Sequence, residues 1–289
     1  MQIVMGILCV VVIICLAIVL VDSNRFVVRK YEIETDLIEK DVTFAFLSDL
    51  HNKSFGKKNA KLLEAIDLAH PAFICCGGDM PTAHPGVSLD TAIHFMQAIA
   101  GKYKIFYANG NHEYRLRIYP EKYGDMHEKY EAALQKMGIH RLLNQAEIWD
   151  DNIVIHGLEL ERTYYKRFHK EIPEVSVLKE QIGDWTKKDG RFHILLAHNP
   201  EYFEQYAKTG VNLVLSGHVH GGVARIPFLG GVISPSFRLF PKYDGGRFEA
   251  SGEQGEDTTM ILSRGLGMHT IPLRFLNPAE LVLITLKKS

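Results

Sequence analysis

The sequence predicts an α/β domain that follows a single membrane-spanning helix. Two features lead to this prediction. Residues 3–21 form an uncharged apolar run, and strand-like and helix-like segments alternate from residue 42 onward, as is typical of an α/β domain. We therefore expect a transmembrane anchor over residues 1–22, a polar connector over residues 23–41 and one large domain over residues 42–289.

The apolar run has the length of a membrane span. At about 1.5 Å per residue it forms a helix about 28 Å long, close to the thickness of a bilayer's hydrocarbon core. A cleaved signal peptide is the alternative, but no Lys or Arg precedes the run and no Ala-x-Ala site follows it. We expect an uncleaved, single-pass anchor in the cell membrane. Arg25, Arg29 and Lys30 follow the run, and the positive-inside rule places the domain on the cytoplasmic side.

The composition is that of an ordinary globular protein. The chain of 289 residues is 46% hydrophobic and 23% charged, and its formal net charge of −1 gives no electrostatic reason to expect nucleic-acid binding. The four cysteines do not suggest a disulfide framework. Cys75 and Cys76 are adjacent in a strand-like run, so we expect buried thiols on opposite faces of a strand. Nothing in the sequence indicates an oligomeric state.

The elements of the domain follow from hydrophobic periodicity. The expected strands cover residues 42–48, 73–76, 104–108, 192–197, 213–216, 259–262 and 281–286. The expected helices cover residues 59–69, 88–100, 126–137 and 201–208. The Asp150-Asp-Asn152 sequence separates two short apolar runs and predicts a hairpin. Residues 27–33 suggest an extended piece, and the polar, aromatic stretch 159–190 suggests a surface excursion.

Polar clusters follow five of the apolar strands. They read Ser48-Asp-Leu-His51, Gly77-Gly-Asp79, Gly110-Asn-His-Glu113, Ala197-His-Asn-Pro200 and Ser216-Gly-His-Val-His-Gly-Gly222. Ligands of open α/β sheets bind at the carboxyl ends of strands, so these clusters can converge on one site. A single histidine at a strand end is usually an ordinary hydrogen-bonded residue. Five clusters in succession argue against a purely structural explanation.

The clusters supply the ligand types of a transition-metal site. Two carboxylates, one amide oxygen and four imidazoles suit Mn²⁺, with Fe and Zn²⁺ as alternatives. Seven side chains exceed the needs of one ion, so two divalent metal ions that share a bridging carboxylate are the economical arrangement. The candidate metal ligands are Asp49, His51, Asp79, Asn111, His198, His218 and His220.

The order of the motifs resembles that of the calcineurin-like metallophosphoesterase superfamily. The motifs are Asp-x-His, Gly-Asp, Gly-Asn-His-Glu, a single His and Gly-His-x-His, within residues 42–286. The apolar N-terminus and the segments 263–267 and 272–275 resemble a bacterial, membrane-associated branch, which includes broad phosphodiesterases and enzymes that cleave UDP-2,3-diacylglucosamine. The resemblance implies a four-layer sandwich, with two central mixed β-sheets flanked by helices.

The resemblance also implies a role for each motif residue. One metal would be held by Asp49, His51 and His220, and the other by Asn111, His198 and His218. Asp79 would bridge both metals, and His112 would be the catalytic residue beside them.

This sequence departs from the family pattern beside the Gly-Asp motif. The family commonly has a second Asp three residues after the position of Asp79, where it helps to orient the motif histidine. Thr82 stands at that place here, which leaves the orientation of His112 open. His84 either compensates for the missing carboxylate or is a plain loop residue.

These residues predict metal-dependent hydrolysis of a phosphoester by a hydroxide that bridges two metals, with His112 as proton donor or as a partner of the phosphoryl group. No Arg lies in residues 80–86, where serine/threonine phosphatases of the superfamily grip a monoester. The membrane is the expected partner, and the anchor favours a lipid-linked diphosphate or phosphodiester as substrate. Two alternatives stay open: a phosphomonoesterase or nucleotidase, and a non-catalytic, metal-stabilised membrane protein.

Two further sets of side chains follow the motifs. The first set can face the substrate or lie on the surface, and it consists of Arg115, Arg117, Arg225 and Arg238. The second set crowds the loop after the last motif, either as local core or as a lip for an acyl chain or the membrane surface. It consists of Phe228, Leu229, Phe237, Leu239 and Phe240.

Overall fold

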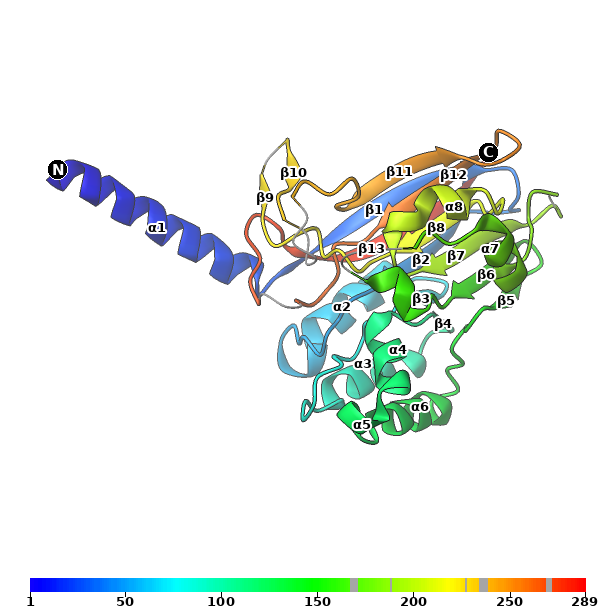
Figure 1. The fold of residues 1–289 in the computed structure, drawn as a ribbon, viewed down its shortest axis with the longest axis horizontal. Helices are drawn as coiled ribbons and strands as arrows, with labels where there is room; N and C mark the ends of the chain where they lie inside the picture. Colours follow the sequence, from blue (N-terminus) through cyan, green and yellow to red (C-terminus); the bar gives the residue numbers. More distant parts are fainter. Residues whose placement is uncertain (167–170, 188, 227, 234–238, 269–271) are drawn as a thin grey trace.

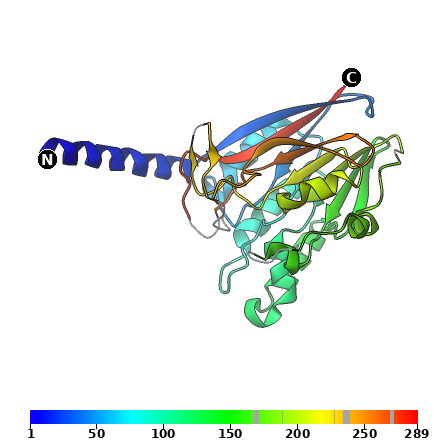
Figure 2. The same ribbon diagram turned by 45° about the horizontal axis from the view of Figure 1, so that its top comes forward.

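The structure is a computed structural model that describes residues 1–166, 171–187, 189–226, 228–233, 239–268 and 272–289 (Figures 1 and 2). Helix α1 (Gln2–Asp22) projects from one end of a domain built on β-sheets. It is the one helix within the described residues that is long and apolar enough to cross a membrane, and its apolar span is not buried in the domain. Phe237 and Arg238, named above as candidates, lie outside the described residues.

The first sheet has five strands in the order β1-β13-β2-β3-β4. Its strands are β1 (Phe26–Thr35), β2 (Val42–Leu47), β3 (Ile74–Cys76), β4 (Ile105–Tyr107) and β13 (Ala279–Lys288). Strand β13 runs parallel to β1 and antiparallel to β2, whereas β2, β3 and β4 are parallel to one another. The carboxyl ends of β2, β3 and β4 therefore lie at the end of the sheet where β1 begins, next to α1.

The second sheet has six strands in the order β11-β12-β8-β7-β6-β5. Its strands are β5 (Gln145–Asp150), β6 (Ile153–Leu158), β7 (Phe192–Ala197), β8 (Leu213–Ser216), β11 (Gly246–Ser251) and β12 (Asp257–Leu262). The four inner strands are parallel, and the two edge strands are antiparallel to their neighbours. The predicted hairpin is confirmed as β5 and β6.

The two sheets pack face to face, and helices cover their outer faces (Figure 1). Side chains of β2 alternate in direction: Phe44 and Phe46 enter the core between the sheets, whereas Ala45 and Leu47 face the helices. Cys75 and Cys76 divide between the same two cores, as predicted. The helices on the first sheet include α2 (Ala60–Ala69), α3 (Asp90–Ala100) and α6 (Met126–Lys136), and those on the second are α7 (Val175–Ile182) and α8 (Phe203–Ala207). The predicted four-layer sandwich of two mixed sheets is confirmed.

Several short elements surround the strand ends, and the sequence predicted few of them. They are η1 (Lys57–Asn59), α4 (Asn111–Ile118), α5 (Pro120–Tyr123), η2 (Arg162–Tyr165), η3 (Pro200–Tyr202), β9 (Arg225–Ile226) and β10 (Gly230–Gly231). Helix α4 was missed because its sequence, NHEYRLRI, has no apolar stripe. It begins directly at the Gly-Asn-His-Glu motif, so its first turn carries polar site residues instead of core residues.

Candidate metal centre

All seven predicted ligands follow the carboxyl ends of parallel strands. Two follow β2, one follows β3, one follows β4, one follows β7 and two follow β8. Backbone hydrogen bonds join the loops that carry them: the Asp49 N–H donates to the Gly78 carbonyl at 2.9 Å, and the Gly217 N–H donates to the His198 carbonyl at 3.1 Å. The His218 N–H donates to the Asp49 carboxylate at 3.1 Å, which ties the first sheet's loop to the second sheet's loop.

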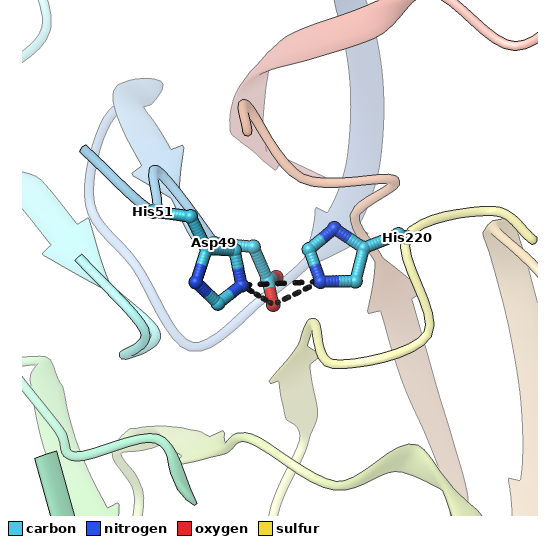
Figure 3. A group of neighbouring side chains, drawn as sticks. All are labelled: Asp49, His51 and His220. Carbon is cyan, nitrogen blue, oxygen red and sulfur yellow. Dashed lines mark hydrogen bonds and ion pairs between the residues drawn. The ribbon is translucent and has the colours of Figure 1, made fainter. Parts of the chain in front are cut away.

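Asp49, His51 and His220 form the first group of side chains (Figure 3). The two imidazole Nε2 atoms lie 3.2 Å apart. Asp49 Oδ1 is 3.4 Å from His220 Nε2 and 3.9 Å from His51 Nε2. Three potential ligand atoms therefore face one another in a space of the size that one cation fills.

Asp79, His198 and His218 form the second group. Asp79 Oδ2 is 3.1 Å from His198 Nε2, and the His198 and His218 ring centroids lie 5.3 Å apart. His198 Nδ1 is 2.7 Å from the Gly77 carbonyl oxygen, so Nδ1–H donates to that carbonyl, and Nε2, the atom left for a metal, faces the carboxylates. This is the tautomer that a metal-ligating histidine needs.

Asp79 lies between the two groups. Its Oδ2 atom is also 3.8 Å from His51 Nε2 and 4.0 Å from His112 Nε2, and these three residues form a third group of potential ligands. A carboxylate shared in this way is what two adjacent cations require.

Asn111 supplies a direct test of whether a cation fits here. Its Oδ1 atom is buried and has no hydrogen-bond partner among the described residues. A buried amide oxygen without a partner costs about 1–3 kcal/mol, so a cation or a hydrogen-bond donor would be stabilised at this position. The neighbouring loops approach the carboxylates so closely that only glycine fits: a Cβ on Gly217 would lie 2.2 Å from Asp49 Oδ2, and one on Gly110 would lie 2.2 Å from Asp79 Oδ1.

The backbone of the site is strained. Asp49, His51, Asp79, His218 and His220 have φ of 55°, 46°, 56°, 72° and 53°, in the left-handed region that favours glycine. Each such residue costs on the order of 1 kcal/mol, and residues of this kind cluster at functional sites. Since five of the seven candidate ligands share this conformation, their positions are set by the site and not by local backbone preference.

Burial and mutual charge perturb the titration of these groups. Burial raises the pKa of Asp49 to about 6. Burial also acts to raise the pKa of Asp79, but the charges of His198 and His112 outweigh it and hold that pKa well below its usual value. Burial acts to lower the pKa of His198, whereas Asp79 and Asp49 raise it to about 10. The two carboxylates thus attract positive charge into a site that excludes water, which is the electrostatic condition for binding divalent cations.

Glu113 has a role that the sequence analysis did not assign. Its carboxylate accepts hydrogen bonds from the backbone N–H groups of Asp79 (2.8 Å), Met80 (3.0 Å) and Gly110 (3.1 Å), and from the hydroxyl of Tyr107 (2.6 Å). It therefore joins the Gly-Asp loop to the start of α4. Burial raises its pKa to about 7. The sequence feature that could have indicated this role is the place of Glu113 at the third position of a helix, where a carboxylate can accept a hydrogen bond from the backbone just before the helix.

The orientation of His112 is set by a backbone group. The Ala83 N–H donates to His112 Nδ1 at 2.7 Å, and the His112 N–H donates to Asp79 Oδ1 at 2.7 Å. The bond from Ala83 makes Nδ1 an acceptor, so the ring hydrogen lies on Nε2, which faces the site. The backbone amide after Thr82 thus takes the place of the family's second Asp. His84 is exposed, and its ring nitrogen contacts the Pro85 carbonyl instead.

Tyr165 also lies against the site. Its ring centroid is 5.3 Å from that of His218 and 6.4 Å from that of His198, and it belongs to η2, within the stretch expected to be a surface excursion. Nothing in the sequence singled out this tyrosine, because its contact with the histidines spans more than thirty positions and has no local pattern.

The three described arginine candidates are engaged elsewhere. Arg115 donates to the Tyr123 hydroxyl at 2.6 Å, and Arg117 pairs with Glu159. Arg225 donates to the Gly221 carbonyl at 3.1 Å and pairs with Asp244. These contacts fit a structural role for each of the three side chains.

Comparison with known proteins agrees with the geometry. A family model described as calcineurin-like phosphoesterase matches residues 42–222. An uncharacterized metallophosphoesterase of Campylobacter jejuni is 28% identical over 266 residues, which cover 90% of this chain and 63% of that protein. One of Aquifex aeolicus is 29% identical over 268 residues, which cover 90% of this chain and 91% of that protein. The NAD nucleotidase of Haemophilus influenzae has a similar fold, with a TM-score of 0.52 and 17% identity, over 78% of this chain and 45% of that one.

The matched residues contain all five motifs, and the Campylobacter jejuni relative is longer than this chain, which spans 63% of its length. The predicted superfamily is confirmed by these findings, and the clustered ligands fit divalent metal binding. By its family model, its curated relatives and its strand-end motifs, the chain belongs to the calcineurin-like phosphoesterase family.

Proposed function

We propose that this protein is a membrane-anchored phosphodiesterase or diphosphatase that works with two divalent metal ions. The observation that carries the proposal is the position of the Asp79 carboxylate, whose Oδ2 atom lies 3.1 Å from His198 Nε2 on one side and 3.8 Å from His51 Nε2 on the other. Asp49, His51 and His220 would hold one ion, and Asn111, His198 and His218 the other. Nitrogen and oxygen ligands without thiolates favour Mn²⁺, with Fe and Zn²⁺ as alternatives.

The bound ions would supply Lewis acidity toward the phosphoryl oxygens and activation of water. The chain's own residues do the rest. Glu113 fixes the loops of Asp79 and Asn111 relative to each other, and the buried carboxylates keep the site charged for its cations. Asn111 contributes a neutral oxygen, which limits the negative charge that an anionic substrate meets.

His112 is the proposed catalytic residue. Because the Ala83 N–H donates to Nδ1, the neutral imidazole presents Nε2–H to the site and can donate a hydrogen bond to a phosphoryl or leaving-group oxygen on which charge develops. A purely structural metal site would not need a histidine held in this tautomer next to its ligands. This observation favours catalysis over the non-catalytic alternative.

The anchor supports a substrate in or near the bilayer. Helix α1 has the length and composition of a membrane span, and Arg25, Arg29 and Lys30 favour a cytoplasmic domain by the positive-inside rule. A lipid-linked diphosphate or phosphodiester is therefore the proposed substrate class, with a phosphomonoester or nucleotide as the alternative.

A paired assay tests the proposal. Full-length protein in detergent, stripped of metal and reloaded with Mn²⁺, should hydrolyse bis(p-nitrophenyl) phosphate faster than p-nitrophenyl phosphate, and metal analysis should find two ions per chain. A higher rate on the monoester would favour the phosphatase alternative. Two bound ions without turnover of either ester, with Mn²⁺, Fe²⁺ and Zn²⁺ each tried, would favour a structural metal site.

A further inference from the structure

We propose that an apolar lip beside α1 inserts into the lipid bilayer and holds the metal site against lipid headgroups. The lip is defined by the large apolar side chains of Ile226, Phe228, Leu229, Leu239, Phe240 and Leu276, all of which are exposed. The inference rests on the proposed anchoring role of α1. It narrows the proposed substrate class to phosphoesters that are carried by membrane lipids.

Backbone hydrogen bonds join the segments that carry the lip. The Leu229 N–H donates to the Ile226 carbonyl at 3.1 Å, and the Arg225 N–H donates to the Phe275 carbonyl at 3.0 Å, next to Leu276. Leu239 forms an isolated antiparallel β-bridge with Ile233, two residues after β10. Phe228 is fully exposed, and Leu229 and Leu239 are each 67% exposed. Contiguous apolar exposure of this kind marks an interaction site.

The backbone of the lip directs its side chains outward at a cost. Phe228, Phe240 and Leu276 have φ of 68°, 46° and 51°, a conformation that is rare for large side chains. Each of these residues carries two costs in water: the strain of its backbone and the exposure of its apolar side chain. Insertion of these side chains into hydrocarbon would remove the cost of their exposure to water.

The lip is attached to the end of α1. The Asn277 N–H donates to Asp22 Oδ2 at 3.1 Å, and the Arg274 N–H donates to Ser23 Oγ at 3.0 Å. Leu276 also lines a groove together with Ile18 of α1. In both views the β9–β10 hairpin lies at the end of the domain from which α1 projects (Figures 1 and 2). The apolar surface of the lip thus continues that of the membrane-spanning helix, and this continuity identifies the bilayer as its occupant.

The metal site lies at the same end of the domain. The first residue of β1, Phe26, pairs with Ala279, and β2 runs toward this end and leads into Asp49. The Asn277 side chain, beside Leu276, donates to the carbonyls of His220 (2.8 Å) and Gly222 (2.7 Å). One residue therefore links the end of α1, the lip and the loop of a candidate metal ligand.

Two basic side chains lie at this level and suit phosphate headgroups. Arg25 is half exposed and pairs with Asp22 at 2.8 Å, and Lys53 Nζ is 3.2 Å from Asn24 Oδ1, just after α1. Cations close to a bilayer surface are attracted to anionic lipids. With the apolar lip in the bilayer and these cations at its surface, a headgroup phosphate is at the depth of the metal site.

A fluorescence experiment tests the insertion directly. Full-length protein with Cys9 and Cys15 replaced by alanine carries one new cysteine, Phe228→Cys, labelled with an environment-sensitive dye, in nanodiscs that hold one copy each. The matched control is Ile148→Cys, an exposed apolar position on β5, far from α1 (Figure 1). We expect at least threefold stronger quenching of the Phe228 probe by spin-labelled lipid than of the control, and protection from aqueous iodide. Equal quenching of both probes by iodide overturns the proposal. Protection of the Phe228 probe that appears only in discs with two copies of the protein also overturns it, because that protection would come from contact between the copies.

A second experiment separates the lip from the chemistry. Phe228→Asp with Leu229→Asp, and the control Ile148→Asp, are assayed on a nitrophenyl phosphodiester carried by a diacylglycerol in vesicles and on soluble bis(p-nitrophenyl) phosphate. We expect a loss of at least tenfold on the vesicle substrate for the lip variant alone, with the soluble ester unaffected. Equal rates of all proteins on vesicles overturn the lip's role in substrate access. If the wild type hydrolyses neither ester, the proposed function fails, whereas the probe experiment still decides whether the lip inserts.

Discussion

Replacement of Glu113 by glutamine, the closest neutral match in shape, should be unexpectedly costly. Glu113 Oε2 accepts from the N–H groups of Asp79 and Gly110, and Oε1 accepts from the Met80 N–H and the Tyr107 hydroxyl. All four are donors, so an amide NH₂ in place of either oxygen faces two donors. In the less costly orientation the NH₂ group takes the place of Oε1. The Tyr107 hydroxyl can then rotate and accept a hydrogen bond from it, whereas the Met80 N–H loses its acceptor.

The magnitude follows from this geometry. A hydrogen bond to a charged group contributes about 1.5–3 kcal/mol, and a buried donor left without a partner costs about 1–3 kcal/mol. We therefore expect Glu113→Gln to lower the free energy of unfolding by about 3 kcal/mol. Tyr107→Phe is the matched control, because it removes one donor to Glu113, together with the contact to the Tyr130 hydroxyl at 3.0 Å, and leaves the three backbone bonds intact; it should cost about 1.5 kcal/mol.

Urea unfolding of the metal-free protein measures both variants, and metal titration measures the site. Because Glu113 holds the backbone next to Asp79 and Asn111, Glu113→Gln should also weaken metal binding at least tenfold, whereas Tyr107→Phe should weaken it less. If the two variants have equal free energies of unfolding and equal metal affinities, Glu113 does not hold the Gly-Asp loop and the start of α4 together.

Three further predictions concern the catalytic histidine, the metal ligands and a buried histidine pair. His112→Ala should lower kcat on a poor leaving group by about 10²–10⁴-fold while the metal content stays at the wild-type level; full activity would refute the catalytic role. Removal of metal by a chelator should lower the melting temperature, and Asp79→Asn should abolish the increase that added Mn²⁺ restores, because the Asp79 carboxylate lies between His198 and His51 and is the proposed bridge between the two metals. His156 is buried, and its Nε2 lies 2.9 Å from His193 Nδ1; burial and the charge of His193 lower the pKa of His156 to about 3. The unfolded chain then binds a proton near pH 6.5 that the folded chain does not, so stability is full above this pH and falls by up to about 1.4 kcal/mol per pH unit below it. His156→Asn should flatten that decline between pH 6.5 and 4 in urea unfolding, and an unchanged slope would show that other groups cause it.

The candidate ligands were accessible to sequence analysis because of a geometric rule. Parallel strands place their carboxyl ends at one edge, so Asp49, Asp79 and His198 could be expected to meet although each lies far from the others in the chain. The alternation of apolar residues also indicated the layers, since Phe44 and Ala45 must face opposite sides of a strand.

Other features depended on contacts that leave no local pattern. Glu113 was visible as part of a motif, but its four donors come from three separate segments. The backbone donor to His112 could not be expected either, because a main-chain amide has no signature in the side-chain sequence. Tyr165 approaches His218 only after η2 has folded across the strand ends.

The position of β13 has a consequence for the order of assembly. This strand lies between β1 and β2, and it pairs with β1 over the whole length from Phe26 to Thr35. During synthesis α1 and β1 leave the ribosome before β13, so the first sheet lacks its second strand until residues 279–288 have emerged. Until then β1 and β2 have unpaired edges, which are prone to pair with other chains. Loss of β13 by truncation should therefore cause aggregation as well as the loss of a functional domain.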